Sequence, residues 1–464
     1  MSEFNVYDCV SPLDFRYYLP DERMTDLLGE YVSEAARVRS EARVEAALAR
    51  VLARRGICSE AIADEIATAA EQVMPAEVAE EEARIHHNIR ALVNSMKTHV
   101  SDEAKPYIHF TFTSFDVIDT ATAWRLRGAT HDAVIPVLLD LERTLIELTR
   151  REAETLQVGR THGQHAVPIT FGFAMAEYVS RLGGRIEKVR EAADGLRGKI
   201  SGAVGAYNAS SLLIDDPEDF EREILAELDL EPSTHSTQVV EGEFMADFVH
   251  SLISTFGVLA NLADDMRHLQ RTEIAEVAEE FQADQVGSST MPHKRNPWNF
   301  ENVKSMWKTF APRMQTVYAD QICEHQRDLS NSASQRFLPE IVVGLVNSVL
   351  RMNRIMSKLV TDSEKMRSNL AMTEGMVTAE PAYILLAAYG HPDAHEAVRE
   401  VTLEAQRTGR PMGEILFADE ELRPWLDQFT DAQREIVLNP ATYTGISAEK
   451  ARIVCDIWAE RLGL

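Results

Sequence analysis

The sequence predicts an all-α protein built mainly from long helices, and three observations support this prediction. Apolar residues recur at helical spacing over long stretches. Runs of alternating β-branched residues joined by hairpin dipeptides are scarce. The chain has 464 residues, of which 45% are apolar, so it can bury a sizeable core. We therefore expect an extended antiparallel bundle of long helices, with smaller helical domains at the N- and C-terminal ends of the chain.

Four apolar stripes mark the long helices. Their spacings of three, four and seven residues place them on one face of a helix, and the first stripe stops at Gly56, a residue suited to a C-terminal cap. Several of these helices are expected to reach 25 residues or more. The stripes are Val44, Leu48, Val51 and Leu52; Leu138, Leu141, Leu145 and Leu148; Phe248, Leu252, Leu259, Leu262, Met266 and Leu269; and Val342, Leu345, Val349, Met352, Met356 and Leu359.

The gaps between the long helices suggest three domains, because the chain has neither a low-complexity linker nor a repeat of solenoid period. We predict an N-terminal helical domain over residues 1–112 and a central bundle over 113–362. Residues 363–464 are then a C-terminal helical domain.

Charge and targeting signals limit the possible partners. The formal net charge is −27 and the pI is near 5.0, which argues against nucleic acid or an anionic membrane surface as a partner. The N-terminal stretch MSEFNVYDCVSP lacks the features of a signal peptide, and no window approaches the ~18 uninterrupted apolar residues of a spanning helix. The four cysteines are scattered without metal-ligand spacing. These features predict a cytoplasmic protein with reduced thiols.

Three polar stretches beside the apolar helices are expected to be loops: IHFTFTSFDVIDT (108–120), GRTHGQHAVPITFG (159–172) and GSSTMPHKRNP (287–297). The third follows the acidic, helical-looking run EIAEVAEE, and its glycine and prolines predict a loop. It matches neither a P-loop nor a GxSxG elbow.

The first two polar stretches also have purely structural interpretations. Thr113, Ser114 and Asp116 are natural N-cap residues for the helix that follows them. His162 and His165 could pair on a metal, but no third ligand stands at a suitable spacing, so no metal site is predicted.

GSSTMPHKRNP, with Glu301 four residues after Pro297, resembles the signature loop GSSxMPxKxNP of the fumarase/aspartase superfamily. Further segments are similar to the adenylosuccinate lyase family, including IHFTFTSFDVIDTA against VHYGLTSxDVxDTA. SPLDFRYY, RIHHNIRAL, GRTHGQHAVPITFG, GKISGAVGAY, STQVV and HQRDLSNSASQR also correspond in order. The resemblance runs from about residue 11 to at least residue 380.

This resemblance implies an anti β-elimination that releases fumarate from an N-succinyl group without any cofactor. Ser288 matches the catalytic base, His162 the general acid and Glu301 the carboxylate that orients the histidine. Lys294 and Asn296 match the groups that bind the succinyl carboxylate and stabilise the aci-carboxylate. The substrate-binding positions that the resemblance implies are Arg16, Tyr17, His87, Asn88, Thr113, Ser114, Gln238, Ser289, Met291, Asn296, Arg327, Ser332 and Arg336.

Two departures from the family pattern affect the pocket. Asn88 follows His87 where the family commonly has Asp, so one charge is lost. After STQ the usual QRD is replaced by VVEGE, although Gln238 itself is retained.

Adenylosuccinate and the related carboxamide ribotide intermediate, SAICAR, are the substrates implied. Arg16, Tyr17, Ser332 and Arg336 match phosphate-contacting positions, which favours a nucleotide substrate over argininosuccinate. A non-catalytic relative, like the lens proteins of this fold, would be expected to lose the signature residues. The resemblance further implies a homotetramer in which three chains contribute to each active site.

Overall fold

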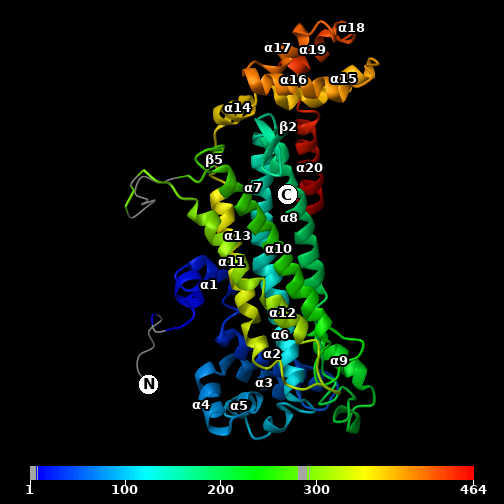
Figure 1. Cartoon of the computed structure of the whole chain (residues 1–464). Coiled ribbons are helices and arrows are strands. Elements are labelled where there is room, and N and C mark those ends of the chain that lie inside the picture. The colour runs from blue at the N-terminus through cyan, green and yellow to red at the C-terminus, as the bar shows by residue number, and fades with distance from the viewer. Residues whose placement is uncertain (1–6, 8, 281–289, 292) are drawn as a thin grey trace. The chain divides into compact units, whose positions relative to one another are not determined.

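The computed structural model describes residues 7, 9–280, 290–291 and 293–464, and helices predominate throughout this part of the chain (Figure 1). The all-α fold class is therefore confirmed. Contacts divide the chain into two units. Unit 1 comprises residues 1–138, 184–259 and 305–350, and unit 2 comprises residues 139–183, 260–304 and 351–464. The three-domain division at residues 112 and 362 stays a prediction.

Unit 1 is organised around helix α2 (Glu34–Arg54), which packs against α3 (Glu60–Gln72) and α6 (Ser114–Ala129). The Ser33 hydroxyl caps α2 by accepting a hydrogen bond from the Ala36 N–H at 3.0 Å. The apolar stripe of α2 is fully buried, and Gly56 follows the helix with φ +71°. This end is the cap that the sequence predicts.

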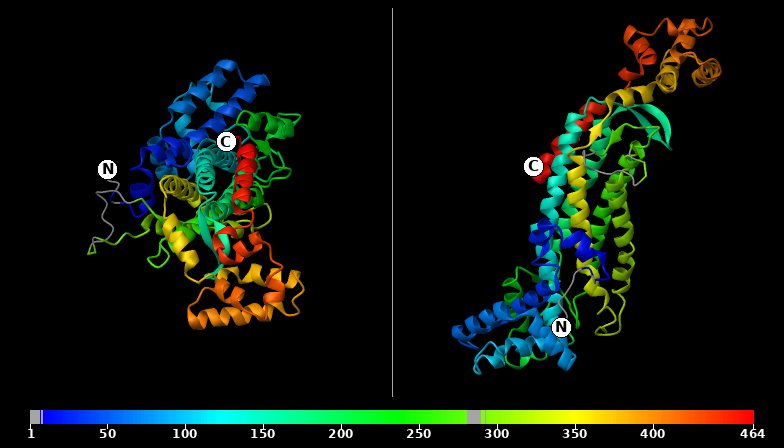
Figure 2. Two further views of the ribbon diagram at one scale, coloured as in Figure 1. Left: turned by 90° about the horizontal axis from the view of Figure 1, so that it is seen from above. Right: turned by 90° about the vertical axis from the view of Figure 1, so that its left-hand side faces the viewer.

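The remaining helices complete unit 1, and α4 (Pro75–Ile85) and α5 (Asn88–Met96), drawn in light blue in Figure 2, pack against each other. Two strands of two residues each pair in parallel. These elements are α1 (Glu22–Leu28), α4 (Pro75–Ile85), α5 (Asn88–Met96), α9 (Pro217–Ala226), α12 (Arg313–Ala319), β3 (Arg197–Gly198) and β4 (Glu231–Pro232).

Five helices contain the boundaries between the units: α7 (Ile135–Arg151), α8 (Phe171–Asp194), α10 (Gly242–Leu269), α11 (Trp298–Phe310) and α13 (Leu338–Met356). They bury the other three predicted stripes almost completely. The expected lengths are partly wrong, because α10, with 28 residues, is the only described helix to reach 25.

A proline explains one of the shorter helices. A π-helical turn at Thr130–Val134 joins α6 to α7, and Pro136 is the second residue of α7. Proline lacks the N–H for an i→i−4 hydrogen bond and clashes with the carbonyl one turn earlier, so the regular helix is interrupted there.

Helix α10 is the one described helix that is long and apolar enough to cross a membrane by length and composition. However, 61% of its most apolar window is buried inside the protein. This burial is typical of a core helix in a globular protein.

Unit 2 contains the β-hairpin of β1 (Leu156–Thr161) and β2 (Gln164–Thr170), and a second antiparallel pair, β5 (Val277–Ala278) and β6 (Val360–Thr361). The C-terminal helices of the chain follow. They are α14 (Ser363–Ala371), α15 (Ala379–Ala388), α16 (Ala394–Thr408), α17 (Met412–Ala418), α18 (Arg423–Leu426), α19 (Asp431–Leu438) and α20 (Ser447–Leu462).

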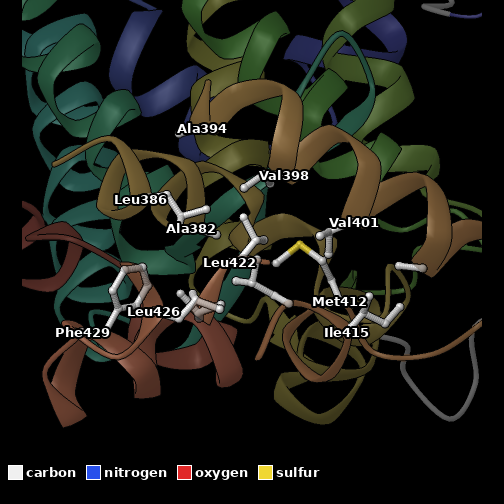
Figure 3. Packing of buried hydrophobic residues seen from close by; sticks show 13 residues of the cluster. Ala382, Leu386, Ala394, Val398, Val401, Met412, Ile415, Leu422, Leu426 and Phe429 are labelled. Carbon is white, nitrogen blue, oxygen red and sulfur yellow. The ribbon is translucent and has the colours of Figure 1, made fainter. Parts of the chain in front are cut away.

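Helices α15 to α19 have an apolar core of their own. Leu386, Met412 and Leu422 lie within this cluster, and the side chains labelled in Figure 3 gather around them. Leu386 and Met412 have no exposed surface. These short helices are therefore held by packing on one another, since helices of this length are marginal in isolation.

Two local predictions are wrong. The segment 159–172, expected to be a loop, forms most of the β1–β2 hairpin. The helical-looking run at 273–280 contains strand β5 instead, and Ala275 within it has φ +50°. In both segments tertiary hydrogen bonding overrides the local pattern.

Candidate active site

The residues predicted for the site divide between the two units. Unit 1 contains ten of the predicted substrate-binding residues: Arg16, Tyr17, His87, Asn88, Thr113, Ser114, Gln238, Arg327, Ser332 and Arg336. Unit 2 contains His162 and the signature loop with Met291, Lys294, Asn296 and Glu301. Ser288 and Ser289 lie outside the described residues.

Thr113 and Ser114 lie at the start of α6, where Thr113 is the N-cap residue. Asp116 Oδ2 accepts a hydrogen bond from the Thr113 N–H at 2.8 Å. The other carboxylate oxygen pairs with Lys199 Nζ, and neither side chain of this ion pair is exposed. The capping interpretation is therefore confirmed, and it leaves the two hydroxyl groups at a positively polarised helix end suited to anions.

The loop before Thr113 is strained. His109 has φ +64°, and its N–H and Nδ1 both lie 2.7 Å from the carboxylate oxygens of buried Glu45. Burial alone lowers the pKa of His109, but the Glu45 carboxylate outweighs this effect and raises it overall. Thr111 has φ +65°, an unfavourable value for a β-branched residue, and stands where the family pattern has glycine.

His87 is the N-cap residue of α5, and Asn88 is the first residue of that helix. His87 Nδ1 accepts a hydrogen bond from the Arg90 N–H at 3.2 Å. In the neutral imidazole this contact assigns the ring proton to Nε2, which can then donate to a ligand.

Gln238 and Arg327 are neighbours through a backbone contact, because the Gln238 N–H donates to the Gln326 carbonyl at 3.1 Å. Arg327 has φ +87° and donates to the Asp320 carbonyl at 3.1 Å. Its Nε is buried without a hydrogen-bond partner among the described residues. The sequence VVEGE (239–243), which departs from the family pattern, directly follows Gln238.

The four predicted phosphate ligands lie in two segments of unit 1. Arg16 and Tyr17 belong to a short helical turn at Leu13–Tyr18, and the Tyr17 carbonyl accepts a hydrogen bond from Asn347 Nδ2 at 3.1 Å. Arg16, Ser332 and Arg336 have exposed side chains. A hydrogen bond from Arg37 lowers the pKa of Glu34 at the start of α2. The positive charge of Arg336 lowers it further, by a smaller amount.

His162 occupies the turn of the β1–β2 hairpin. Thr161 pairs with Gln164, so His162 and Gly163 form the two-residue loop, with φ values of +55° and +73°. Positive φ at both central residues is the requirement of a type I′ turn, and histidine tolerates it better than most residues. The imidazole is therefore at the exposed tip of the hairpin.

The hairpin is anchored at Glu276, a residue that the sequence did not single out. Its side chain is fully buried and forms an ion pair with Arg160. Gln157 Nε2 and Asn369 Nδ2 each donate to the same carboxylate at 2.8 Å. Glu276 thereby joins the hairpin that carries His162 to α14.

Glu279, three residues further on, caps the helix that carries Glu301. Its carboxylate accepts hydrogen bonds from the Asn299 and Phe300 N–H groups at 3.0 and 3.1 Å, and Asn299 Nδ2 donates to it as well. Burial raises the pKa of Glu279 despite these bonds. The Glu279 carboxylate therefore caps the N-terminus of α11, the helix that follows the signature loop.

The expected pairing of Glu301 with His162 is not made within the described part of the chain, where both side chains are exposed. Lys294 lies in the loop, and its N–H donates to the Met291 carbonyl at 3.0 Å. The pairing stays a prediction.

Comparisons with known proteins agree with the resemblance. Residues 16–309 match the family model described as Lyase, and residues 323–443 match the one described as Adenylosuccinate lyase C-terminal. The chain is 34% identical to adenylosuccinate lyase from Pyrococcus abyssi, over 94% of this chain and 98% of the relative. It is 32% identical to the adenylosuccinate lyase of Archaeoglobus fulgidus, over 96% and 98%.

A solved structure extends the similarity to the fold. The crystal structure of 3-carboxy-cis,cis-muconate lactonizing enzyme from Pseudomonas putida is similar with a TM-score of 0.84 and 25% identity, over 97% of this chain and 99% of that one. Because two family models together match most of the chain, and the sequence relatives match it over nearly their full length, the chain belongs to the adenylosuccinate lyase family of the fumarase/aspartase superfamily.

Proposed function

We propose that this chain cleaves adenylosuccinate to AMP and fumarate by anti β-elimination, and that it also cleaves SAICAR. The observation that carries the proposal is the near-full-length similarity to adenylosuccinate lyases, in a chain that retains every catalytic residue of the signature pattern. A non-catalytic relative would have no need of this complete set.

In the proposed reaction, the Ser288 alkoxide removes the Cβ proton of the succinyl group. The electron pair left on Cβ is delocalised into the neighbouring carboxylate as an aci-carboxylate, which Lys294 and Asn296 stabilise by charge and hydrogen bonding. Collapse of this intermediate breaks the C–N bond. His162 then supplies a proton to the departing nitrogen, so that fumarate and the amino product are released.

Two buried carboxylates hold the elements that carry these residues, which supports the proposed roles. Glu276 holds the base of the His162 hairpin, and Glu279 holds the start of the helix that carries Glu301. An acid that protonates a leaving group has to be held within hydrogen-bonding reach of it, and rigid support of this kind meets that need.

We further propose a cytoplasmic homotetramer in which different chains supply His162 and the signature loop. The exposure of both His162 and Glu301 in the single chain favours such an arrangement, since a general acid and its orienting carboxylate work best when water is excluded. The nucleotide phosphate would be bound by Arg16, Tyr17, Ser332 and Arg336.

Ultraviolet absorbance of purified protein mixed with adenylosuccinate tests the activity directly. We expect conversion to AMP and fumarate, and no conversion of argininosuccinate. Arg336→Ala should raise the Michaelis constant by roughly one to two orders of magnitude and lose most of the preference for the phosphorylated substrate over its nucleoside. Cleavage of argininosuccinate by the wild type would leave only the broader assignment of a fumarate-releasing lyase.

A further inference from the structure

A small cavity of about 70 Å³ lies within unit 1 beside Arg327. Apolar side chains such as Val239 and Phe244 form much of its wall, and Asp119 on α6 forms part of its polar side. The cavity also borders the VVEGE segment that departs from the family pattern. None of the roles assigned above uses Asp119.

Asp119 holds the backbone of the segment that carries Gln238. Its Oδ2 accepts a hydrogen bond from the Val240 N–H at 2.9 Å. Two residues earlier, the Gln238 N–H donates to the Gln326 carbonyl. The segment is therefore fixed on one side by Asp119 and on the other by the residue before Arg327.

Arg327 faces the same cavity with part of its hydrogen-bonding capacity unused. Backbone carbonyls of Asp320 and Gln321 accept hydrogen bonds from its terminal nitrogens, at 3.1 and 3.4 Å. These contacts orient the guanidinium without neutralising its charge. Its positive charge acts on Asp328 and also on Asp119, where it favours the ionised carboxylate.

Two charged groups besides Arg327 act on Asp119. Lys199 favours its ionised form but is paired with Asp116, which opposes ionisation. The other charged groups that line the cavity are Arg197, Glu241 and Asp320. Removal of Asp119 from bulk water has the largest effect and raises its pKa to about 6.

We propose that Asp119 is a positioning residue that fixes the Gln238 segment and takes up a proton when an anionic group of the substrate binds at Arg327. This inference rests on the proposed function, because it takes Arg327 as a ligand of substrate carboxylate. A bound anion adds negative charge beside Asp119 and competes with it for the field of Arg327. Both effects stabilise the protonated carboxyl.

The sign of the pH dependence follows from linkage. If binding raises the pKa of Asp119, anion affinity is highest when Asp119 is protonated. Affinity then falls as pH rises from about 6, where free Asp119 ionises, through the higher pKa of the bound state. The loss reaches about tenfold for each unit by which binding raises the pKa.

Isothermal titration calorimetry with fumarate tests the proposal, because fumarate does not itself titrate near neutral pH. Titrations near pH 6.5 in buffers of different ionisation enthalpy give the number of protons taken up per site. We expect Asp119→Asn, which keeps an acceptor for the Val240 N–H, to bind fumarate with less proton uptake than the wild type. Proton uptake by any other group that responds to the anion is common to both proteins and cancels in the comparison.

Asp320→Asn is the matched control, since Asp320 lines the same cavity but accepts a hydrogen bond from the Ser334 hydroxyl. It should retain the wild-type proton uptake. Asp119→Ala, which removes the acceptor as well, should also weaken fumarate binding. Equal proton uptake in the wild type and Asp119→Asn would overturn the proposal.

Infrared difference spectra of the wild type provide a test that needs no variant. Adding fumarate near pH 6.5 should produce a new band of a protonated carboxyl group, and its absence would also overturn the inference. Turnover of adenylosuccinate by the same preparation separates the two proposals. An active enzyme with unchanged proton uptake in Asp119→Asn refutes only the role of Asp119, whereas an inactive wild type refutes the proposed function.

Discussion

At the scale of single residues, the most informative feature is the backbone conformation of His162. The side chain needed for proton transfer stands at a turn position that requires φ above zero. Few side chains tolerate that conformation, and histidine and asparagine are among the better ones. Function and turn geometry can therefore be separated by substitution at this position.

We predict that His162→Asn preserves the β1–β2 hairpin but removes the general acid. Turnover should fall by a factor on the order of 10²–10⁴, the usual contribution of a general acid, while the melting temperature stays near that of the wild type. Steady-state kinetics and thermal unfolding check the two parts. His162→Gly, which also suits the turn, should behave in the same way, and substantial turnover in either variant would contradict the assignment of the acid.

A second residue-scale prediction concerns Glu142 on α7. Its side chain has no exposed surface, both carboxylate oxygens lack hydrogen-bond partners among the described residues, and burial raises its pKa to about 9. The folded state therefore binds a proton that the unfolded state releases above its ordinary pKa of about 4.3. The stability that Glu142 contributes is fully present below that pH and is lost as pH rises toward 9, by up to ~1.4 kcal/mol per pH unit.

Glu142→Gln removes this ionisation while keeping the shape of the side chain. Its melting temperature relative to the wild type should therefore rise between pH 6 and pH 8. Glu147→Gln, at an exposed position of the same helix, is the control and should show no such trend. A difference between Glu142→Gln and the wild type that is independent of pH would show that Glu142 is ionised in the folded protein.

At the scale of elements, the segment around β5 connects the parts of unit 2 that hold the predicted catalytic groups. Glu276 joins the hairpin to α14, and Glu279 caps α11. The two carboxylates stand three positions apart but serve different elements. Strand β5, with a buried carboxylate on either side, thus holds the hairpin and the start of α11 in place.

We expect Glu276→Gln to be strongly destabilising, because it leaves Arg160 without its buried counter-charge. Loss of one partner from such a pair typically costs about 3–5 kcal/mol of unfolding free energy. Turnover should fall as well, since the hairpin that carries His162 loses its anchor. Denaturant unfolding and kinetics of Glu276→Gln, compared with exposed Glu273→Gln from the same run, give the measurement. Equal stability of the two variants would contradict this role.

At the scale of the whole molecule, the proposed tetramer predicts complementation between inactive chains. Ser288→Ala and His162→Ala chains should each be inactive. After subunit exchange, a mixture should recover part of the wild-type activity, because some sites would then draw both intact residues from different chains. Mixtures that remain inactive, with exchange verified by mass spectrometry of labelled chains, would argue against shared sites.

Residue spacing and motifs were enough to predict the all-α fold class, the positions of the long helices and the family. Helical periodicity is a local property, so the stripes of α2, α7, α10 and α13 could be read directly from residue spacing. The signature loop was recognisable because its residue types occur at fixed spacing within eleven positions. The cap at the start of α6 was equally local.

The polar residues that support the site are brought together only when the chain folds. Arg160 and Glu276 are 116 positions apart in the sequence, and Asp119 is 121 positions from the Val240 N–H that it holds. No local pattern distinguishes Glu276 from the exposed acids beside it, since its role arises from desolvation and pairing in the folded chain. The hairpin at 156–170 was missed for a related reason: its strands are stabilised by pairing and by the Glu276 anchor, which a window of sequence does not contain.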